Sequence, residues 1–247
     1  MRWPRATRRD AVKGTVALGL KGLNVTVPHK VKVVDYINKL SEEAAVIGSV
    51  NTVVNELGKL IGYNTDVNGI LESLSPYKSQ INGNQVCVLG AGGSARAVIY
   101  TLIRNFKPSK IILINRTEQF AETLKQHFKS KMKFDGIVTK ELQQPDLKNL
   151  VNSCALIVNC TSVGMYPDAD DSIFTNADLF VKDQIVFDLV SNPVKTKFLQ
   201  LAESKGAIGV NGLNMLVQQA AKAFKLWTGN EFPTEKVYKS LLLYVTK

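Results

Sequence analysis

The sequence is poor in cysteine and histidine. It has three cysteines and two histidines in 247 residues, and neither His29 nor His127 has other ligand-type residues at metal-binding spacing. We therefore predict no metal site. Cys87, Cys154 and Cys160 show no C-x-x-C spacing, and two of them lie in apolar, strand-like runs. This pattern argues against a disulfide framework and favours buried free thiols in a reducing, cytoplasmic location.

Long apolar runs are also missing. No run approaches the roughly 18 to 20 residues that a membrane-spanning helix needs, so we expect no membrane partner. Hydrophobic residues make up 45% of the chain and charged residues 21%, which is the usual balance for a globular protein.

The net charge of +10 raises the possibility of a nucleic-acid partner, but its distribution argues against one. About half of the excess lies in residues 1–22, and the other basic residues are scattered among acidic ones without an aromatic-interleaved stripe. We therefore expect no nucleic-acid binding. A mildly basic surface also suits an enzyme that binds anionic small molecules.

The chain divides into two regions with different sequence patterns, joined by a short polar segment. In residues 11–76, a short helix is predicted at 41–48, with Ser41 as its cap and Gly48 as its end, and strands at 50–54 and 59–64 flank a turn. Residues 73–84 are rich in Ser, Pro, Asn and Gly and are predicted to form a linker.

From Gln85 onward, short apolar strands alternate with amphipathic helices, and this alternation predicts a parallel sheet covered on both faces. The final segment from Gly212 is again helical. We expect it to return to the first region, which would place a cleft between two domains. The predicted strands cover residues 85–90, 110–115, 154–160, 184–190 and 207–211.

A glycine-rich turn follows the first of these strands. Residues 86–98 read VCVLGAGGSARAV, so Gly90-x-Gly92-x-x-Ala95 lies between an apolar strand and a helix. Gly90 permits a tight turn, Gly92 lets a pyrophosphate approach the backbone, and Ala95 keeps the helix close to the sheet. The pattern predicts a dinucleotide-binding Rossmann domain.

The end of the second strand indicates which dinucleotide binds. An NAD-selective site usually has a carboxylate there, whereas this chain has Asn115, Arg116 and Thr117. Arginine matches a 2′-phosphate in charge and geometry, so NADP is favoured over NAD.

Seven motifs, in order, resemble those of the shikimate dehydrogenase family. They are GLNVTVPHK (22–30), VNT (50–52), GYNTD (62–66), GAGGSARA (90–97), NRT (115–117), NCTSVGM (159–165) and NGLNMLVQQA (211–220). Each motif is ordinary alone, but their order and spacing are specific. The resemblance implies an NADP-dependent oxidoreductase that interconverts shikimate and 3-dehydroshikimate in aromatic amino acid (chorismate) biosynthesis.

The resemblance also implies roles for individual residues. Lys30 and Asp66 match the catalytic pair at the reacting C3 oxygen, and Thr26, Asn51 and Gln219 match positions that bind the substrate's hydroxyls. Leu189 and Gly212 match positions near the nicotinamide. The remaining cofactor positions are Gly90, Ala91, Gly92, Gly93, Ser94, Asn115, Arg116 and Thr117.

The expected architecture is a Rossmann domain at 82–211 and a smaller α/β substrate domain at 1–76, completed by C-terminal helices at 212–247. A homodimer is compatible with the resemblance. Family members also have a Ser-x-Ser loop that binds the substrate carboxylate. MRWPRATRR does not match that loop, so the chain is expected to lack the family's N-terminal end, at a cost of about 10² to 10⁴ in substrate affinity.

Two further departures bear on specificity. Ser191 stands where the family commonly has tyrosine, and Phe120 stands where many members have a basic residue. These departures and the missing Ser-x-Ser loop leave two alternatives open. One is a quinate-preferring or broad-specificity relative, and the other is a catalytically weak NADP-binding fragment.

Overall fold

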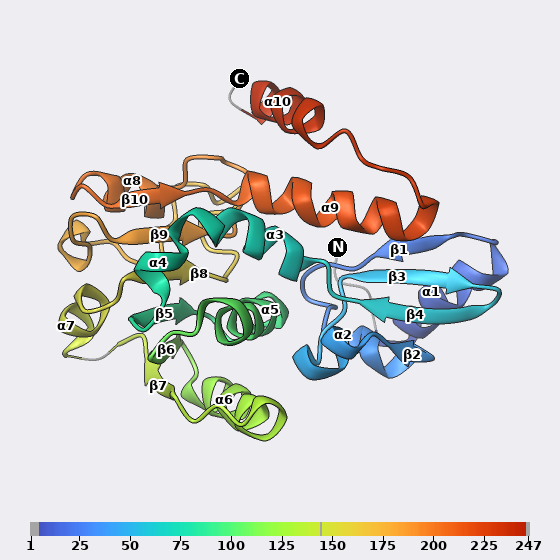
Figure 1. The fold of residues 1–247 in the computed structure, drawn as a ribbon, viewed down its shortest axis with the longest axis horizontal. Coiled ribbons are helices and arrows are strands. Elements are labelled where there is room, and N and C mark those ends of the chain that lie inside the picture. The colour runs from blue at the N-terminus through green and yellow to red at the C-terminus, as the bar shows by residue number, and fades with distance from the viewer. Residues whose placement is uncertain (1–4, 144, 246–247) are drawn as a thin grey trace.

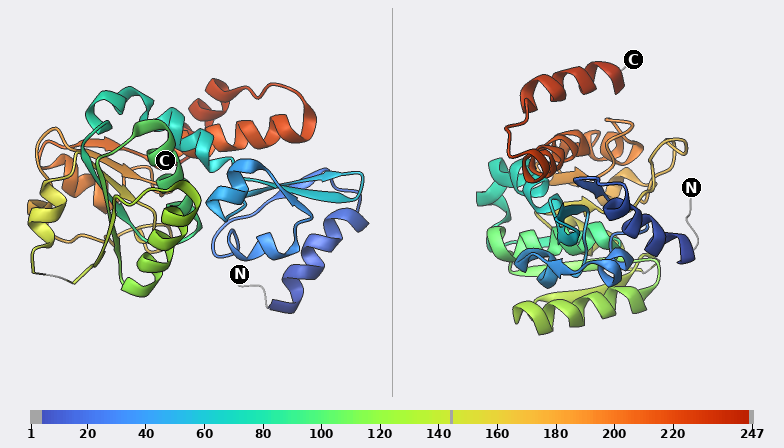
Figure 2. Two further views of the ribbon diagram at one scale, coloured as in Figure 1. Left: turned by 60° about the horizontal axis from the view of Figure 1, so that its bottom comes forward. Right: turned by 90° about the vertical axis from the view of Figure 1, so that its right-hand side faces the viewer.

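The computed structural model describes residues 5–143 and 145–245, which form an α/β structure with two sheets (Figure 1). The fold class predicted from the sequence is confirmed. Figure 2 shows the two sheets side by side, each with its own helices. None of the helices in these two ranges combines the length and apolar character required to span a bilayer.

The smaller sheet has four strands in the order β1-β3-β4-β2. Its strands are β1 (Gly22–Asn24), β2 (Lys39–Leu40), β3 (Thr52–Glu56) and β4 (Lys59–Tyr63). The turn between β3 and β4 places Leu57 and Gly58 at positive φ, as a two-residue hairpin turn requires, and Asn55 Oδ1 accepts a 2.9 Å bond from Gly58 N. The two strands predicted around this turn are confirmed.

Three helical segments accompany this sheet: α1 (Arg5–Ala17), the 3₁₀ helix Lys32–Tyr36 and α2 (Glu42–Ile47). Ser41 Oγ accepts a bond from Ala44 N at the start of α2, and Gly48 ends it with φ of 69°. Both ends of this helix are therefore as predicted. Val12 of α1 is buried with Val53 and Leu60 in the core of this region.

The larger sheet has six parallel strands in the order β10-β9-β8-β5-β6-β7. They are β5 (Gln85–Leu89), β6 (Lys110–Asn115), β7 (Ile137–Glu141), β8 (Leu156–Asn159), β9 (Ile185–Asp188) and β10 (Ile208–Val210). Five of them match the predicted strands. The sixth, β7, was missed because its sequence, IVTKE, has no continuous apolar run.

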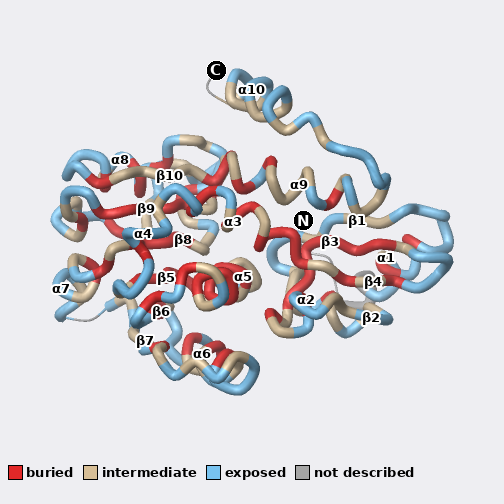
Figure 3. Tube along the Cα trace, in the orientation of Figure 1, coloured by how far each residue is buried: buried red, intermediate tan, exposed pale blue. Residues whose placement is uncertain are grey.

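Helices cover both faces of the six-stranded sheet. Alternate residues of β5 enter different cores: Val86 and Val88 join one cluster, whereas Cys87 and Leu89 join the other. Strands buried on both faces explain the continuous apolar runs in the sequence, and Figure 3 shows the central strands β5, β8 and β9 largely in the colour of buried residues. The covering helices include α5 (Gly93–Thr101), which continues as a π-helical segment at Leu102–Phe106, α6 (Glu118–Met132), α7 (Leu147–Asn152) and α8 (Lys197–Glu203).

Two helices join the sheets. α3 (Asp66–Leu74) packs on α9 (Gly212–Thr228) and on α5. A Cβ on Gly69 would lie 2.4 Å from the carbonyl oxygen of Met215, so glycine permits this close helix contact. At the other end of α9, Trp227 Nε1 donates a 2.9 Å bond to Val53 O of the smaller sheet. α9 therefore extends from one sheet to the other (Figure 1).

The chain passes between the sheets through residues 75–81, which form the 3₁₀ helix Ser75–Tyr77 and the short helix α4 (Lys78–Ile81). The segment predicted as a linker thus contains two helical turns. The last helix, α10 (Thr234–Val245), packs on α9, and none of its residues is fully buried (Figure 3).

Candidate active site

A cleft of about 800 Å³ lies between the two sheets, at the carboxyl ends of the larger sheet's strands. This is where the strand order reverses, because β6 and β8 lie on opposite sides of β5. Most of the predicted site residues line the cleft. They are Thr26, Lys30, Asn51, Asp66, Gly90, Ala91, Gly92, Gly93, Ser94, Asn115, Leu189, Gly212 and Gln219.

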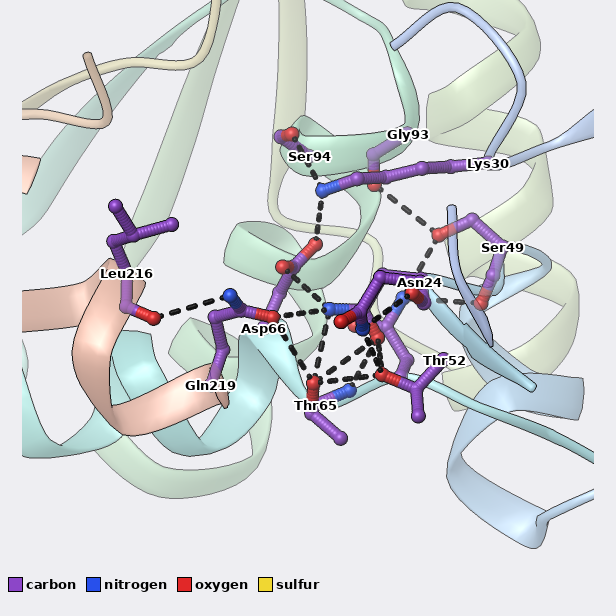
Figure 4. A network of polar contacts seen from close by, with 12 residues as sticks. Asn24, Lys30, Ser49, Thr52, Thr65, Asp66, Gly93, Ser94, Leu216 and Gln219 are labelled. Carbon is purple, nitrogen blue, oxygen red and sulfur yellow. Dashed lines mark hydrogen bonds and ion pairs between the residues drawn. The ribbon is translucent and has the colours of Figure 1, made fainter. Parts of the chain in front are cut away.

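Lys30 and Asp66 form an ion pair in this cleft. Lys30 Nζ lies 2.7 Å from Asp66 Oδ2, and the two side chains are only 11% and 4% exposed. Asp66 is the first residue of α3, whereas Lys30 lies in the loop after β1. Lys30 Nζ is also 3.5 Å from Ser94 Oγ at the start of α5 (Figure 4). The pair therefore lies where the smaller sheet meets the glycine turn.

A polar network fixes the orientation of the Asp66 carboxylate. Asn51 Nδ2 donates to Asp66 Oδ1 at 2.9 Å, and Asn51 Oδ1 accepts a 2.7 Å bond from Thr65 N. The backbone donor on the oxygen side fixes the amide of Asn51 in this orientation. Asn51 Nδ2 also lies 3.2 Å from Gln219 Oε1. Gln219, which is labelled in Figure 4, brings α9 into the network. The predicted residues Asn51, Asp66 and Gln219 are thus brought together.

The glycine turn has the shape that a pyrophosphate requires. Gly90 has φ of +99°, and a Cβ there would lie 2.9 Å from Thr161 Cγ2. A Cβ on Gly92 would meet no atom within 4 Å, so this position faces open space in the cleft. α5 begins at Gly93 without a side-chain cap, which leaves its first amides available to an anion. These residues fit a dinucleotide.

The end of β6 carries the predicted 2′-phosphate site. Asn115 lines the cleft and donates a 2.8 Å bond to Thr117 O. Arg116 and Thr117 are exposed and do not line the cleft itself. Arg116 forms no ion pair with any residue in the described part of the chain, so its guanidinium is available to a ligand.

Family comparison agrees with this geometry. The model of the shikimate/quinate 5-dehydrogenase family matches residues 73–203, that of the shikimate dehydrogenase substrate-binding domain matches residues 3–53, and that of the shikimate 5′-dehydrogenase C-terminal domain matches residues 212–242. The chain belongs to the shikimate dehydrogenase family.

Individual family members are similar over most of the chain. The NADP(+) shikimate dehydrogenase of Caldanaerobacter subterraneus is 43% identical over 94% of this chain and 81% of its own length. That of Bacillus subtilis is 41% identical over 92% of this chain and 79% of its own. A shikimate dehydrogenase solved with NADP+ superposes with a TM-score of 0.89 at 35% identity, covering 100% of this chain and 84% of that one. The Thermus thermophilus shikimate 5-dehydrogenase, solved with NADP(H) and shikimate, superposes with a TM-score of 0.81 at 34% identity. The match covers 96% of this chain and 84% of that one.

This shikimate dehydrogenase family member also has cleft residues to which the sequence assigned no role. Thr161, Ser162 and Met165 belong to the NCTSVGM motif, so the motif itself was a signal that could have identified them. Cys160 belongs to the same motif, and burial raises the pKa of its thiol far above the ordinary value. A neutral buried thiol is a poor nucleophile, which argues against covalent catalysis by Cys160. The other unassigned lining residues are Asn24, Val25, Val27, Val190, Ser191, Met215 and Leu216.

Contacts between the two halves of the family fold hold the cleft walls together. Ser49 Oγ donates a 3.2 Å bond to Gly93 O at the start of α5. At the other end of the junction, His127 Nε2 lies 2.7 Å from Val46 O, and Arg96 Nη1 donates to Ile47 O at 3.3 Å. The last carbonyls of α2 are thus bound by side chains of α5 and α6. Burial lowers the pKa of His127, and its carbonyl partner requires a proton on Nε2.

Proposed function

We propose that this chain is an NADP-dependent shikimate dehydrogenase that reversibly reduces 3-dehydroshikimate to shikimate. The observation that carries the proposal is the buried pair of Lys30 and Asp66, which faces the glycine turn across one cleft. We assign residues 1–76 and 212–247 to the substrate domain and residues 82–211 to the cofactor domain. Each contributes one wall of the cleft.

Bound NADP(H) would supply the hydride acceptor or donor through its nicotinamide ring. The backbone of Gly90, Ala91, Gly92, Gly93 and Ser94 would hold the pyrophosphate, because the turn is open there and followed by uncapped helix amides. Asn115, Arg116 and Thr117 would hold the 2′-phosphate and ribose, and Leu189 and Gly212 would contact the nicotinamide through their backbones.

Lys30 handles the proton at the C3 oxygen of the substrate. Reduction of a ketone places negative charge on its oxygen, and the ammonium of Lys30 stabilises that charge and donates the proton. In the oxidation direction, the same nitrogen accepts the proton from the hydroxyl. Asp66 holds Lys30 at 2.7 Å and has its own orientation fixed by Asn51, so the nitrogen is held at one point in the cleft.

The hydroxyls of the substrate need groups that both donate and accept. Asn51 and Gln219 offer both functions, and Asn51 Nδ2 lies 3.2 Å from Gln219 Oε1. Thr26 lines the cleft from the loop after β1. We therefore assign these three residues to the binding of the substrate's hydroxyls.

Replacement of Lys30 tests the proposal. Lys30→Met removes the charge but keeps the aliphatic stem, and we expect kcat for shikimate-dependent NADPH formation to fall by about 10² to 10⁴. The dissociation constant for NADP should stay within about twofold, which is under 1 kcal/mol. Lys32→Met is the matched control, because Lys32 is exposed and outside the cleft.

Two results would contradict the proposal. Undiminished turnover in Lys30→Met would remove Lys30 from the mechanism, and a wild-type protein that binds NADP but does not oxidise shikimate would refute the function. The same assay with quinate tests the specificity, because Ser191 leaves one wall of the cleft with a small side chain. A higher kcat/KM for quinate would reassign the substrate.

The proposal places the enzyme in the cytoplasm. Its support is that Cys87, Cys154 and Cys160 are all free thiols.

Light scattering on the purified protein distinguishes a monomer from a homodimer.

A further inference from the structure

A carboxylate that the proposed reaction does not use lies directly behind the cleft. Asp188 ends β9 and has no exposed surface. Within residues 5–143 and 145–245, it forms no ion pair. Its Oδ1 accepts bonds from Asn159 Nδ2 and Val190 N, both at 3.0 Å, and its Oδ2 accepts a 2.6 Å bond from Thr196 Oγ1.

This arrangement is costly for stability. Burial raises the pKa of Asp188 to about 6, against three hydrogen bonds that lower it. An ionised carboxylate without a cation is therefore kept in the core near neutral pH, where an apolar residue would be less costly. The role of Asp188 therefore depends on which parts of the structure its three hydrogen-bond donors hold in place.

The first donor leads to the glycine turn. Asn159 Oδ1 accepts bonds from Thr161 N at 3.0 Å and Thr161 Oγ1 at 2.8 Å, so the amide of Asn159 has to point its nitrogen at Asp188. Thr161 in turn packs on Gly90, because a Cβ on Gly90 would lie 2.9 Å from Thr161 Cγ2. Asp188 thus fixes one wall of the cleft through Asn159.

The second donor leads to the start of α9. The bond from Val190 N holds the backbone after β9, where Leu189 and Val190 line the cleft. Their carbonyl oxygens would lie 2.6 and 2.7 Å from a Cβ on Gly212, so this loop and α9 are in close contact. A shift of the loop would therefore move the wall formed by Leu189, Val190 and Gly212.

The third donor, Thr196, is not part of the cleft wall. Thr196 Oγ1 accepts a 3.3 Å bond from Leu199 N as the cap of α8 and donates its own hydrogen to Asp188. Thr196 is fully buried and is not among the residues that line the cleft. It contacts the same carboxylate without forming a wall of the site.

The sheet topology shows which part of a dinucleotide these walls would meet. The proposed pyrophosphate site is at the end of β5, and the proposed 2′-phosphate site is at the end of β6, which lies on one side of β5. The nicotinamide half then lies over the ends of β8 and β9, on the other side of β5. Thr161, Leu189 and Val190 belong to these ends.

We propose that Asp188 is a positioning residue for the nicotinamide half of the cofactor, acting through Asn159 and Thr161 on one side and through the Leu189–Val190 backbone on the other. The inference rests on the proposed use of NADP and adds a residue that does not touch the cofactor. Asp188→Asn tests it, because this substitution keeps the shape but places an N–H group opposite groups that are themselves donors.

Binding of two ligands distinguishes positioning from a general loss of structure. For Asp188→Asn, we expect the dissociation constant of NADP to rise about tenfold, the effect of leaving one buried donor unpaired. Adenosine 2′,5′-bisphosphate has the adenosine and 2′-phosphate but no nicotinamide, and its dissociation constant should stay within about twofold. Thr196→Val is the matched control. It removes a donor to the same carboxylate, and NADP binding should be retained.

Three results would overturn the inference: an equal loss for both ligands in Asp188→Asn, no loss for either, or the same selective loss in Thr196→Val. Should Asp188→Asn fail to fold, Asn159→Ser cuts the Thr161 branch alone and should weaken NADP but not the bisphosphate. An Asn159→Ser variant with wild-type NADP affinity would then refute the inference. Since binding needs no turnover, these tests stay separate from a failure of the proposed reaction.

Discussion

Gly92 provides a test in which cofactor binding and folding are expected to separate. It precedes the first residue of α5, with φ of −88° and ψ of −167°, a conformation that alanine also adopts. A Cβ there would meet no protein atom within 4 Å. Gly92→Ala therefore adds a methyl group to the cleft without displacing any part of the protein.

The magnitudes follow from this geometry. Alanine lowers the entropy of the unfolded chain, which stabilises by about 0.4 to 1 kcal/mol, and it is a poorer helix cap than glycine by a similar amount. The free energy of unfolding should thus change by less than about 1 kcal/mol. The methyl group would hold a pyrophosphate away from the backbone, and the loss of two charge-assisted bonds of about 1.5 to 3 kcal/mol each lowers affinity by about 10² to 10⁴.

Urea unfolding without ligand and calorimetric titration with NADP measure the two effects separately. Gly14→Ala is the control, because Gly14 lies inside α1 with open space around its Cβ position. It should gain about 0.5 to 1 kcal/mol of stability and bind NADP like the wild type. A Gly92→Ala variant that binds NADP within about threefold of the wild type, under 1 kcal/mol, would refute the role of this turn.

Three further predictions concern charge and contacts around the cleft. Arg116→Ala should weaken the binding of NADP by about 10- to 100-fold and leave the binding of NAD unaffected, because only NADP carries the 2′-phosphate. Equal losses of affinity in titrations with NADP and with NAD would exclude a contact of Arg116 with the 2′-phosphate. The pKa of Asp188 is about 6 in the folded protein and 3.8 in the unfolded chain. The neutral carboxyl therefore contributes to the free energy of unfolding below pH 3.8, and this contribution is lost as the pH rises through about 6. Urea unfolding at a series of pH values across this interval should show the free energy of unfolding of the wild type falling by up to about 3 kcal/mol relative to that of Asp188→Asn. The same pH dependence in both proteins would contradict the raised pKa. His127→Phe removes the bond to Val46 O and should lower the free energy of unfolding by about 1 kcal/mol, with an unchanged urea midpoint as the contrary result.

Features that depend on neighbours along the chain were predictable. The helix between Ser41 and Gly48 is set by its own cap and its own left-handed end, and the β3–β4 hairpin by its turn. The strand–glycine–helix unit at 86–98 is local as well, so its place in a dinucleotide-binding fold could be predicted from residue order alone. Strand β7 was missed because its sequence, IVTKE, lacks the continuous apolar run by which the other strands were recognised.

Contacts between distant segments were not predictable in the same way. The roles assigned to Lys30 and Asp66 came from a family resemblance, and no periodicity indicates that residues 36 positions apart form an ion pair. The bond of Asn51 to Gln219 spans 168 positions. The apolar run at 184–190 predicts that Asp188 is buried, but it does not indicate which groups the carboxylate contacts.

By itself, the sequence determined the class of the fold, the glycine turn and the arginine beside it, because these follow from local backbone preferences and from the burial pattern of each strand. Only the tertiary structure decided which polar groups meet in the cleft and which carboxylate lies behind it. The physical reason is that hydrogen bonds and ion pairs act over about 3 Å in space, whereas the residues that form them can be separated by most of the chain.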